Sequence, residues 1–155
     1  MRWLERLISI LDRERKLIEE MILLLERERE AIVDGDMDGL LSIAKEKETL
    51  GTKHKMLEEA RVLCLKNAGK EGRTVSQLME ELAPHETSRL KEAVEGLKAA
   101  VERLGWENKR NLLLINKAME LNSELLRIFS PLYSLSYRPD GTLNTDFNGG
   151  LQIRG

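Results

Sequence analysis

The sequence has few of the residues that would indicate a secreted or membrane protein. It contains one cysteine, Cys64, among 155 residues, so no intramolecular disulfide can form and a reducing compartment is expected. The longest apolar runs, residues 21–25 and 112–115, are far short of the roughly 20 residues that span a membrane. Residues 1–5 lack the apolar stretch of a signal peptide. These absences predict a soluble, cytoplasmic protein without membrane insertion.

The sequence also lacks an excess of either charge. It has 25 basic and 27 acidic residues, for a formal net charge of −2, so no basic face for nucleic acid is expected. Aromatic residues make up 4% and charged residues 34% of the chain. A high content of both charges with many Leu, Ala, Glu, Lys and Arg residues is typical of long helices and coiled coils.

Two long helices are predicted in the first half of the chain. Residues 3–33 contain neither Gly nor Pro, and their apolar residues recur at intervals of three and four. Gly35 can end this helix in the left-handed conformation, and Asp36 can cap the next one, expected at residues 37–67. The short turn favours an antiparallel hairpin. The apolar stripe of the second helix is interrupted by charged or titratable residues at Lys47, His54 and Arg61.

The second half predicts a short helix, a long helix and a tail. Thr74 and Gln77 have the spacing of a capping box, which opens the short helix. Residues 86–129 form the longest predicted helix, on the order of 65 Å if unbroken. The sequence therefore predicts an all-α fold, an antiparallel bundle of three long helices and one short helix. Its domain would cover residues 1–130, followed by an extended, flexible C-terminal tail at 131–155.

The residues that could take part in catalysis or bind a metal do not form a catalytic or metal-binding pattern. His54 and His85 both lack a Glu three residues earlier, so the Glu-x-x-His pairs of di-iron bundles are missing. Glu58 could share a face with His54, but a solvated or partly packed histidine is the favoured interpretation. Cys64 lies on an apolar face and is interpreted as a buried thiol. The segment 69–74 lacks the order of a phosphate-binding loop and is interpreted as a linker. We therefore predict no enzyme activity, metal or cofactor.

The last long helix has an unusual feature, since asparagines occupy its apolar seam. Asn108, Asn111 and Asn122 follow the same spacing of three and four as the leucines around them. Buried asparagine weakens a core but can fix the register of helices. One interpretation is bundle specificity, or rotation of this face to solvent. The other is that this half of the helix is uncovered in the monomer and receives a partner segment. Periodicity alone leaves both open.

Several segments in the last 45 residues resemble one known family. Residues 111–114 (Asn-Leu-Leu-Leu), Asn122 and residues 125–131 (Leu-Leu-Arg-Ile-Phe-Ser-Pro) resemble the C-terminal helix of FlgN-type flagellar export chaperones. Residues 137–141 (Tyr-Arg-Pro-Asp-Gly) are similar to the Tyr-x-x-x-Gly element that follows that helix. Upstream, the glycine turn and the Glu- and Lys-rich residues 45–50 resemble the corresponding hairpin of the family.

This resemblance implies an export chaperone for the hook–filament junction proteins FlgK and FlgL. Such a chaperone keeps the C-terminal segments of its clients unpolymerised and delivers them to the flagellar type III export gate. The resemblance also implies docking of Tyr137 on the gate protein FlhA, with Tyr133 as the alternative tyrosine. The client-binding residues that it implies are Asn111, Leu114, Ala118, Leu121, Asn122, Leu125 and Ile128.

The helices alone also fit another class of function. A coiled-coil structural or adaptor protein would have the same periodicity and could act through helix–helix homo- or hetero-association. The asparagine seam could then mediate homo-oligomer formation. A helical-bundle enzyme is the third class, and the missing metal ligands argue against it.

Overall fold

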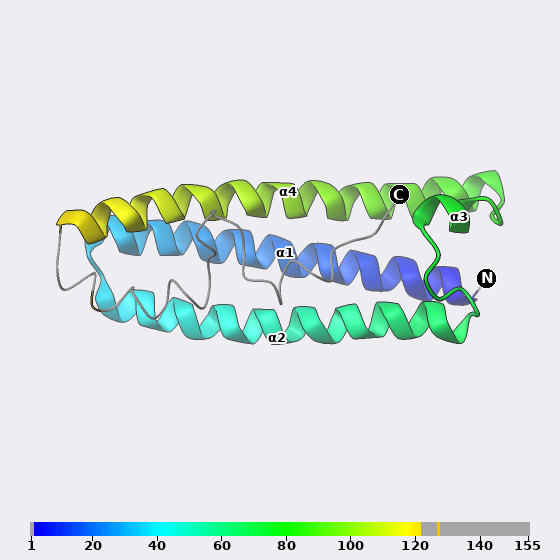
Figure 1. The fold of residues 1–155 in the computed structure, drawn as a ribbon, viewed down its shortest axis with the longest axis horizontal. Helices are drawn as coiled ribbons and strands as arrows, with labels where there is room; N and C mark the ends of the chain where they lie inside the picture. The colour runs from blue at the N-terminus through cyan, green and yellow to red at the C-terminus, as the bar shows by residue number, and fades with distance from the viewer. Residues whose placement is uncertain (1, 122–126, 128–155) are drawn as a thin grey trace.

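The computed structural model describes residues 2–121 and residue 127. The helices of this part are α1 (Arg2–Asp34), α2 (Met37–Asn67), α3 (Val75–Met79) and α4 (Pro84–Leu121). The described residues contain no strand. The three long helices lie along one another, and short α3 covers one end (Figure 1). This arrangement confirms the predicted all-α bundle. The tail expected at residues 131–155 lies outside the described residues.

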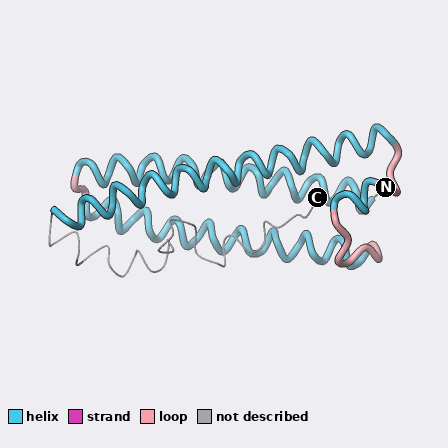
Figure 2. The backbone as a smooth tube through the Cα atoms, turned by 45° about the horizontal axis from the view of Figure 1, so that its top comes forward, coloured by secondary structure: helices cyan, strands magenta, loops and turns pink. Residues whose placement is uncertain are grey.

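Helix α1 is the central helix of the bundle. It runs antiparallel to α2 and parallel to α4, because the chain reverses direction after α1 and again after α2 (Figures 1 and 2). Close backbone approaches join α1 to α4 and α1 to α2, and α2 and α4 approach each other much less. Fourteen residues of α1 are buried, which is the wide stripe needed to contact two partners. The α1 side chains therefore form half of the apolar core of the described residues.

The turn between α1 and α2 follows the predicted pattern. Gly35 has a φ of +66°, the left-handed conformation that a residue without a Cβ adopts at little cost. The N–H of Asp36 donates to the carbonyl of Ala31, and the N–H of Gly35 donates to that of Ile32, which satisfies two carbonyls of the last turn of α1. The Asp36 carboxylate accepts from the N–H of Gly39 at 2.9 Å and caps α2. The hairpin is therefore set by local sequence.

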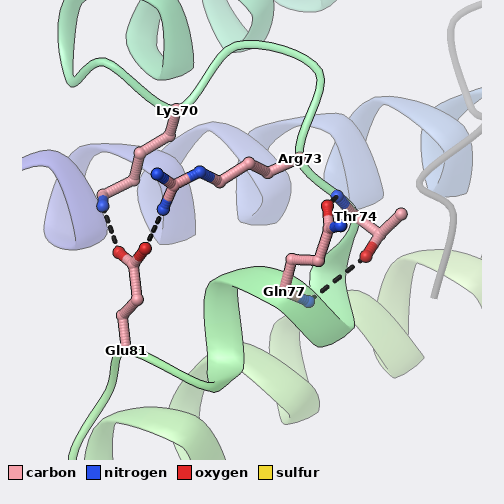
Figure 3. Close-up of polar contacts among 5 residues, drawn as sticks. All are labelled: Lys70, Arg73, Thr74, Gln77 and Glu81. Atoms are coloured by element: carbon pink, nitrogen blue, oxygen red, sulfur yellow. Dashed lines mark hydrogen bonds and ion pairs between the residues drawn. The ribbon is translucent and has the colours of Figure 1, made fainter.

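The predicted capping box is present at the start of α3. The N–H of Gln77 donates to the Thr74 hydroxyl, and the Thr74 N–H donates to the Gln77 side chain (Figure 3). Beside it, Lys70 and Arg73 both pair with the Glu81 carboxylate (Figure 3). The segment before α3 is thus held by ion pairs to a residue that follows α3, in agreement with its interpretation as a linker.

Helix α4 begins at Pro84, two residues before the predicted start at Glu86. Proline suits the first position of a helix, where the missing N–H is not needed. The Glu86 carboxylate accepts from the N–H of Ala83 at 3.1 Å and caps the helix from inside. The apolar pattern could not reveal this start because it begins only at Leu90.

Buried apolar residues form two clusters along the bundle. The larger one joins the first three quarters of α1 to α3, Cys64 of α2 and α4 as far as Leu104. The smaller one lies at the hairpin end and includes Ile32, Ile43 and Ile115. Polar side chains of all three long helices are buried near the region where the clusters meet.

Candidate binding surface

The C-terminal end of α4 projects beyond the hairpin that joins α1 to α2 (Figure 1). The parallel register explains this projection. Asn111 of α4 lies beside Glu28 of α1, and α1 ends only six residues later at Asp34. Helix α4 continues to Leu121, ten residues after Asn111. The last residues of α4 therefore extend past the end of α1.

Exposure rises along this end of α4. Leu114 and Ala118 are half-buried and pack against the cluster at the hairpin end. Leu121 is 81% exposed. A leucine exposed to this extent costs free energy in water that burial against a partner would recover, at roughly 25 cal/mol per Å² of apolar surface. The end of α4 thus combines partial packing with an uncovered apolar side chain.

Asn111, expected in the client-binding set, lies inside the bundle. It is 0% exposed, and its amide nitrogen donates to the Leu25 carbonyl at 2.8 Å and to the Glu28 carboxylate at 2.9 Å. Asn108 is also 0% exposed, and neither polar atom of its amide has a hydrogen-bond partner among the described residues. For these two asparagines, the structure favours bundle specificity over an uncovered face.

Asn122, Leu125, Ile128 and both candidate docking tyrosines, Tyr133 and Tyr137, lie outside the described residues.

A ladder of charged side chains joins α1 to α2. At one end Arg61 donates to the Glu14 carboxylate at 3.3 Å, and at the other Lys47 pairs with Glu28. Each pair is almost fully buried, with side-chain exposures of 8% and 0% for the first and 9% and 7% for the second. Asn111 adds a hydrogen bond to Glu28, so the second pair connects all three long helices. Buried ion pairs contribute little net stability but penalise a shifted register.

Burial dominates the titration of this ladder. It raises the pKa of Glu14 from 4.5 to about 7, against the attraction of the Arg61 guanidinium and with a smaller repulsion from Glu58. Burial also lowers the pKa of Lys47, although Glu28 favours its charged form. Near neutral pH Glu14 is therefore divided between its protonated and ionised forms.

His54 corrects one expectation from the sequence. It is 0% exposed, not solvated or partly packed, and the antiparallel register places it midway between the two ion pairs. Burial lowers its pKa from 6.5 to about 4, and the Arg61 charge acts in the same direction. The imidazole is therefore neutral near pH 7.

The spacing of charged residues in the sequence could have revealed this ladder, whereas the spacing of apolar residues does not. Lys47, His54 and Arg61 are seven residues apart on α2, and Glu14 and Glu28 are fourteen apart on α1. Opposite charges with matching heptad spacing on two helices of a hairpin indicate paired rungs.

Cys64 is a buried free thiol, as predicted. It is 4% exposed, and its Sγ lies 3.5 Å from the Trp3 carbonyl oxygen. Burial raises its pKa, which keeps the sulfur in its less reactive form. Within residues 2–121 and 127, no three His, Cys, Asp or Glu side chains gather into a group that could hold a metal ion.

A cavity of about 350 Å³ lies at the α3 end of the bundle, bordered by all four helices. Its lining combines apolar side chains, among them Leu7, Leu78 and Leu90, with the polar residues Arg61, Arg73 and Thr74.

Comparison with known proteins agrees with this geometry. No helix of the described part is long and apolar enough to cross a membrane. Searches of curated proteins and of solved structures return no match to the chain. The model of one protein family, described as "FlgN protein", matches residues 1–145, almost the whole chain. The chain therefore belongs to the FlgN family of flagellar export chaperones.

Proposed function

We propose that this protein is a cytoplasmic, non-enzymatic chaperone for the C-terminal segments of the hook-associated proteins FlgK and FlgL. It would prevent their premature polymerisation and deliver them to the export gate protein FlhA. The observation that carries this proposal is the end of α4, which projects past the hairpin and exposes 81% of Leu121.

The proposed mechanism is the addition of a client helix to the projecting end. A client segment that folds into an amphipathic helix would bury its apolar face against the α4 stripe. The stripe begins at the half-buried Leu114 and Ala118, passes Leu121 and continues in sequence through Leu125 and Ile128. The client segment would thus extend the bundle where α1 and α2 end.

Asparagines would tune this interaction. Asn111 holds the inner end of the stripe by its bonds to α1, so it would position the site. Asn122, one heptad and four residues further, would pair with polar groups of the client. Polar seam positions limit affinity while fixing register, which suits a chaperone that must release its cargo. Tyr137 would then dock on FlhA, with Tyr133 as the alternative.

Calorimetric titration with C-terminal segments of FlgK and FlgL tests the proposal. The intact chain should bind at least one segment saturably, and Leu121→Asp should weaken that binding by tenfold or more. The matched control is Leu63→Asp, which changes a leucine of α2 that is 55% exposed and lies near the opposite end of the bundle. Circular dichroism should remain helical in both variants because neither side chain is buried.

Truncation after Ser123 gives a second test, because it removes Leu125, Ile128 and the tail but keeps the described bundle. Binding of the client segments should be lost while the helical signal is retained. Binding by neither segment to the intact chain would contradict the client assignment. Equal binding by the truncated chain would contradict the site.

A further inference from the structure

The outward face of α4 carries an exposed stripe that the bundle does not use. Its centre is Trp106, which is 66% exposed, and Leu113 one heptad later is 71% exposed. Large exposed apolar side chains in a row on one helix face are unusual for an isolated surface and indicate an interaction site. The Lys109 ammonium lies 5.2 Å from the centre of the Trp106 ring, so a cation already covers part of the indole.

The charges along this stripe change sign at Trp106. The residues before it on the same face are Glu95, Ala99 and Glu102, and those after it are Arg110, Leu113 and Lys117. All of them are exposed. The only salt bridge of this set within the described residues is a long one of 4.0 Å from Glu95 to the exposed Lys91. Most of the charges are therefore available to a partner.

The stripe is also symmetric in its spacing. Glu102 and Arg110 lie four residues on either side of Trp106, Ala99 and Leu113 lie seven, and Glu95 and Lys117 lie eleven. Two copies of such a helix that run antiparallel about a two-fold axis bring equidistant positions together. Each of these three pairs then joins residues of complementary charge or size.

We infer that a second copy of this chain binds here, so that two α4 helices form an antiparallel symmetric dimer centred on Trp106. The two indoles stack near the axis, and each Leu113 packs on the small Ala99 of the other copy. Glu102 pairs with Arg110 and Glu95 with Lys117, twice each. The inference does not depend on client binding, because the stripe faces away from Asn111 and Ile115.

The edges of the stripe limit the contact. Glu92 and Glu120 are both acidic and lie fourteen residues from Trp106, so repulsion ends the interface there. Arg103 and Lys109, each three residues from Trp106, would be a like-charged pair. Arg103 instead lies toward Glu26 of α1 at 3.9 Å, and Lys109 lies over the indole.

Sedimentation equilibrium of the full chain and two charge-reversal variants tests this inference. The wild-type chain should show a concentration-dependent dimer. Glu102→Arg and Arg110→Glu should each weaken dimerisation by at least tenfold, because each places like charges together twice. An equimolar mixture of the two variants should dimerise again, since both kinds of contact then join Arg to Glu. Restoration on mixing requires the antiparallel pairing and would not follow from a general change of net charge.

Two further variants sharpen the test. Trp106→Ala should also abolish the dimer, whereas Leu23→Ala, which removes a leucine of α1 that is 61% exposed, should leave it unchanged. Circular dichroism and urea unfolding check that all variants keep their fold. A monomeric wild-type chain at several hundred micromolar, or a mixture of the charge variants that stays monomeric, would overturn the inference. The inference would also be overturned if the stripe bound a protein of a different sequence but not a second copy of this chain.

Discussion

Helix α1 makes two long interfaces, and the side chains that form them differ in kind. Toward α4 the interface is mainly apolar, with Leu90, Val94, Leu97 and Leu104 all at most 4% exposed. Toward α2 its middle is polar. Only five residues of α2 are buried, and they are Leu40, Ile43, His54, Arg61 and Cys64.

The difference separates two tasks that one helix interface often performs together. Apolar burial against α4 supplies most of the free energy of folding, because it scales with area and tolerates small shifts. The Glu14–Arg61 and Glu28–Lys47 pairs supply little net energy but allow only one register of the hairpin. The contacts with parallel α4 therefore supply most of the stability, and the contacts with antiparallel α2 fix the register of the hairpin.

The largest expected effect is a cavity in the α4 interface. Leu97→Ala should lower the free energy of unfolding by about 2–5 kcal/mol, because Leu97 is 1% exposed in the main cluster. Urea denaturation measures this change. The matched variant Leu57→Ala removes a half-buried leucine of α2 and should cost clearly less. Equal costs would show that the two interfaces contribute alike.

Breaking one rung of the ladder should have the next largest effect. Arg61→Met leaves the buried Glu14 without its partner and should cost about 2–3 kcal/mol, less than a typical broken buried pair because Glu14 can take up a proton. The double variant Glu14→Leu/Arg61→Met should recover most of that loss in the same urea assay. A double variant as unstable as the single one would mean that the pair itself stabilises the fold.

The pH dependence of stability should contain two opposed contributions of about 2–3 kcal/mol each. Folded Glu14 keeps its proton up to about pH 7, so its contribution to stability falls as the pH rises from 4.5 to 7. Folded His54 stays neutral down to about pH 4, so its contribution to stability rises as the pH increases from 4 to 6.5. Urea denaturation should therefore give a nearly flat profile for these groups between pH 4.5 and 6.5. His54→Leu should leave a falling profile and Glu14→Gln a rising one, and parallel profiles would refute the two assignments.

The smallest effects should come from the buried asparagines of α4. Asn108→Leu should raise the free energy of unfolding by about 1 kcal/mol, because it removes a buried amide without a protein partner among the described residues. Asn111→Leu should lower it by about 1 kcal/mol, because it removes two hydrogen bonds to α1. Thermal unfolding of both variants, with the exposed Asn116→Leu as control, measures these changes. A change in the free energy of unfolding with the same sign in both variants would contradict the opposite roles assigned to the two asparagines.

Local features of the fold were predictable from the sequence because they depend on neighbours along the chain. The extent of α2, the glycine turn at Gly35 and the capping box at Thr74 are all as predicted. The burial of Cys64 was also predictable, since the apolar stripe around it points to the core.

Features that depend on distant partners were not predictable in the same way. Helical periodicity places His54 on a face of α2, but its complete burial results from the packing of α1 against that face. It also places Asn111 on the seam without revealing that the Leu25 carbonyl accepts from it. For the candidate site, the family resemblance and not the spacing implied Leu114, Ala118 and Leu121. The projection that exposes Leu121 follows from the parallel register of α1 and α4, which no single helix encodes.

The order of the interfaces along the chain has a consequence for folding during synthesis. The α1–α2 hairpin closes a turn of two residues, so its contacts can form as soon as α2 leaves the ribosome. The contact between Asn111 and Glu28 spans 83 residues and must await the far end of the chain. The early interface is the polar one, and the late interface is the apolar one. The register of the nascent hairpin is therefore fixed before the hairpin is very stable. The α1 leucines that face α4 remain exposed until α4 has been synthesised and packs against them.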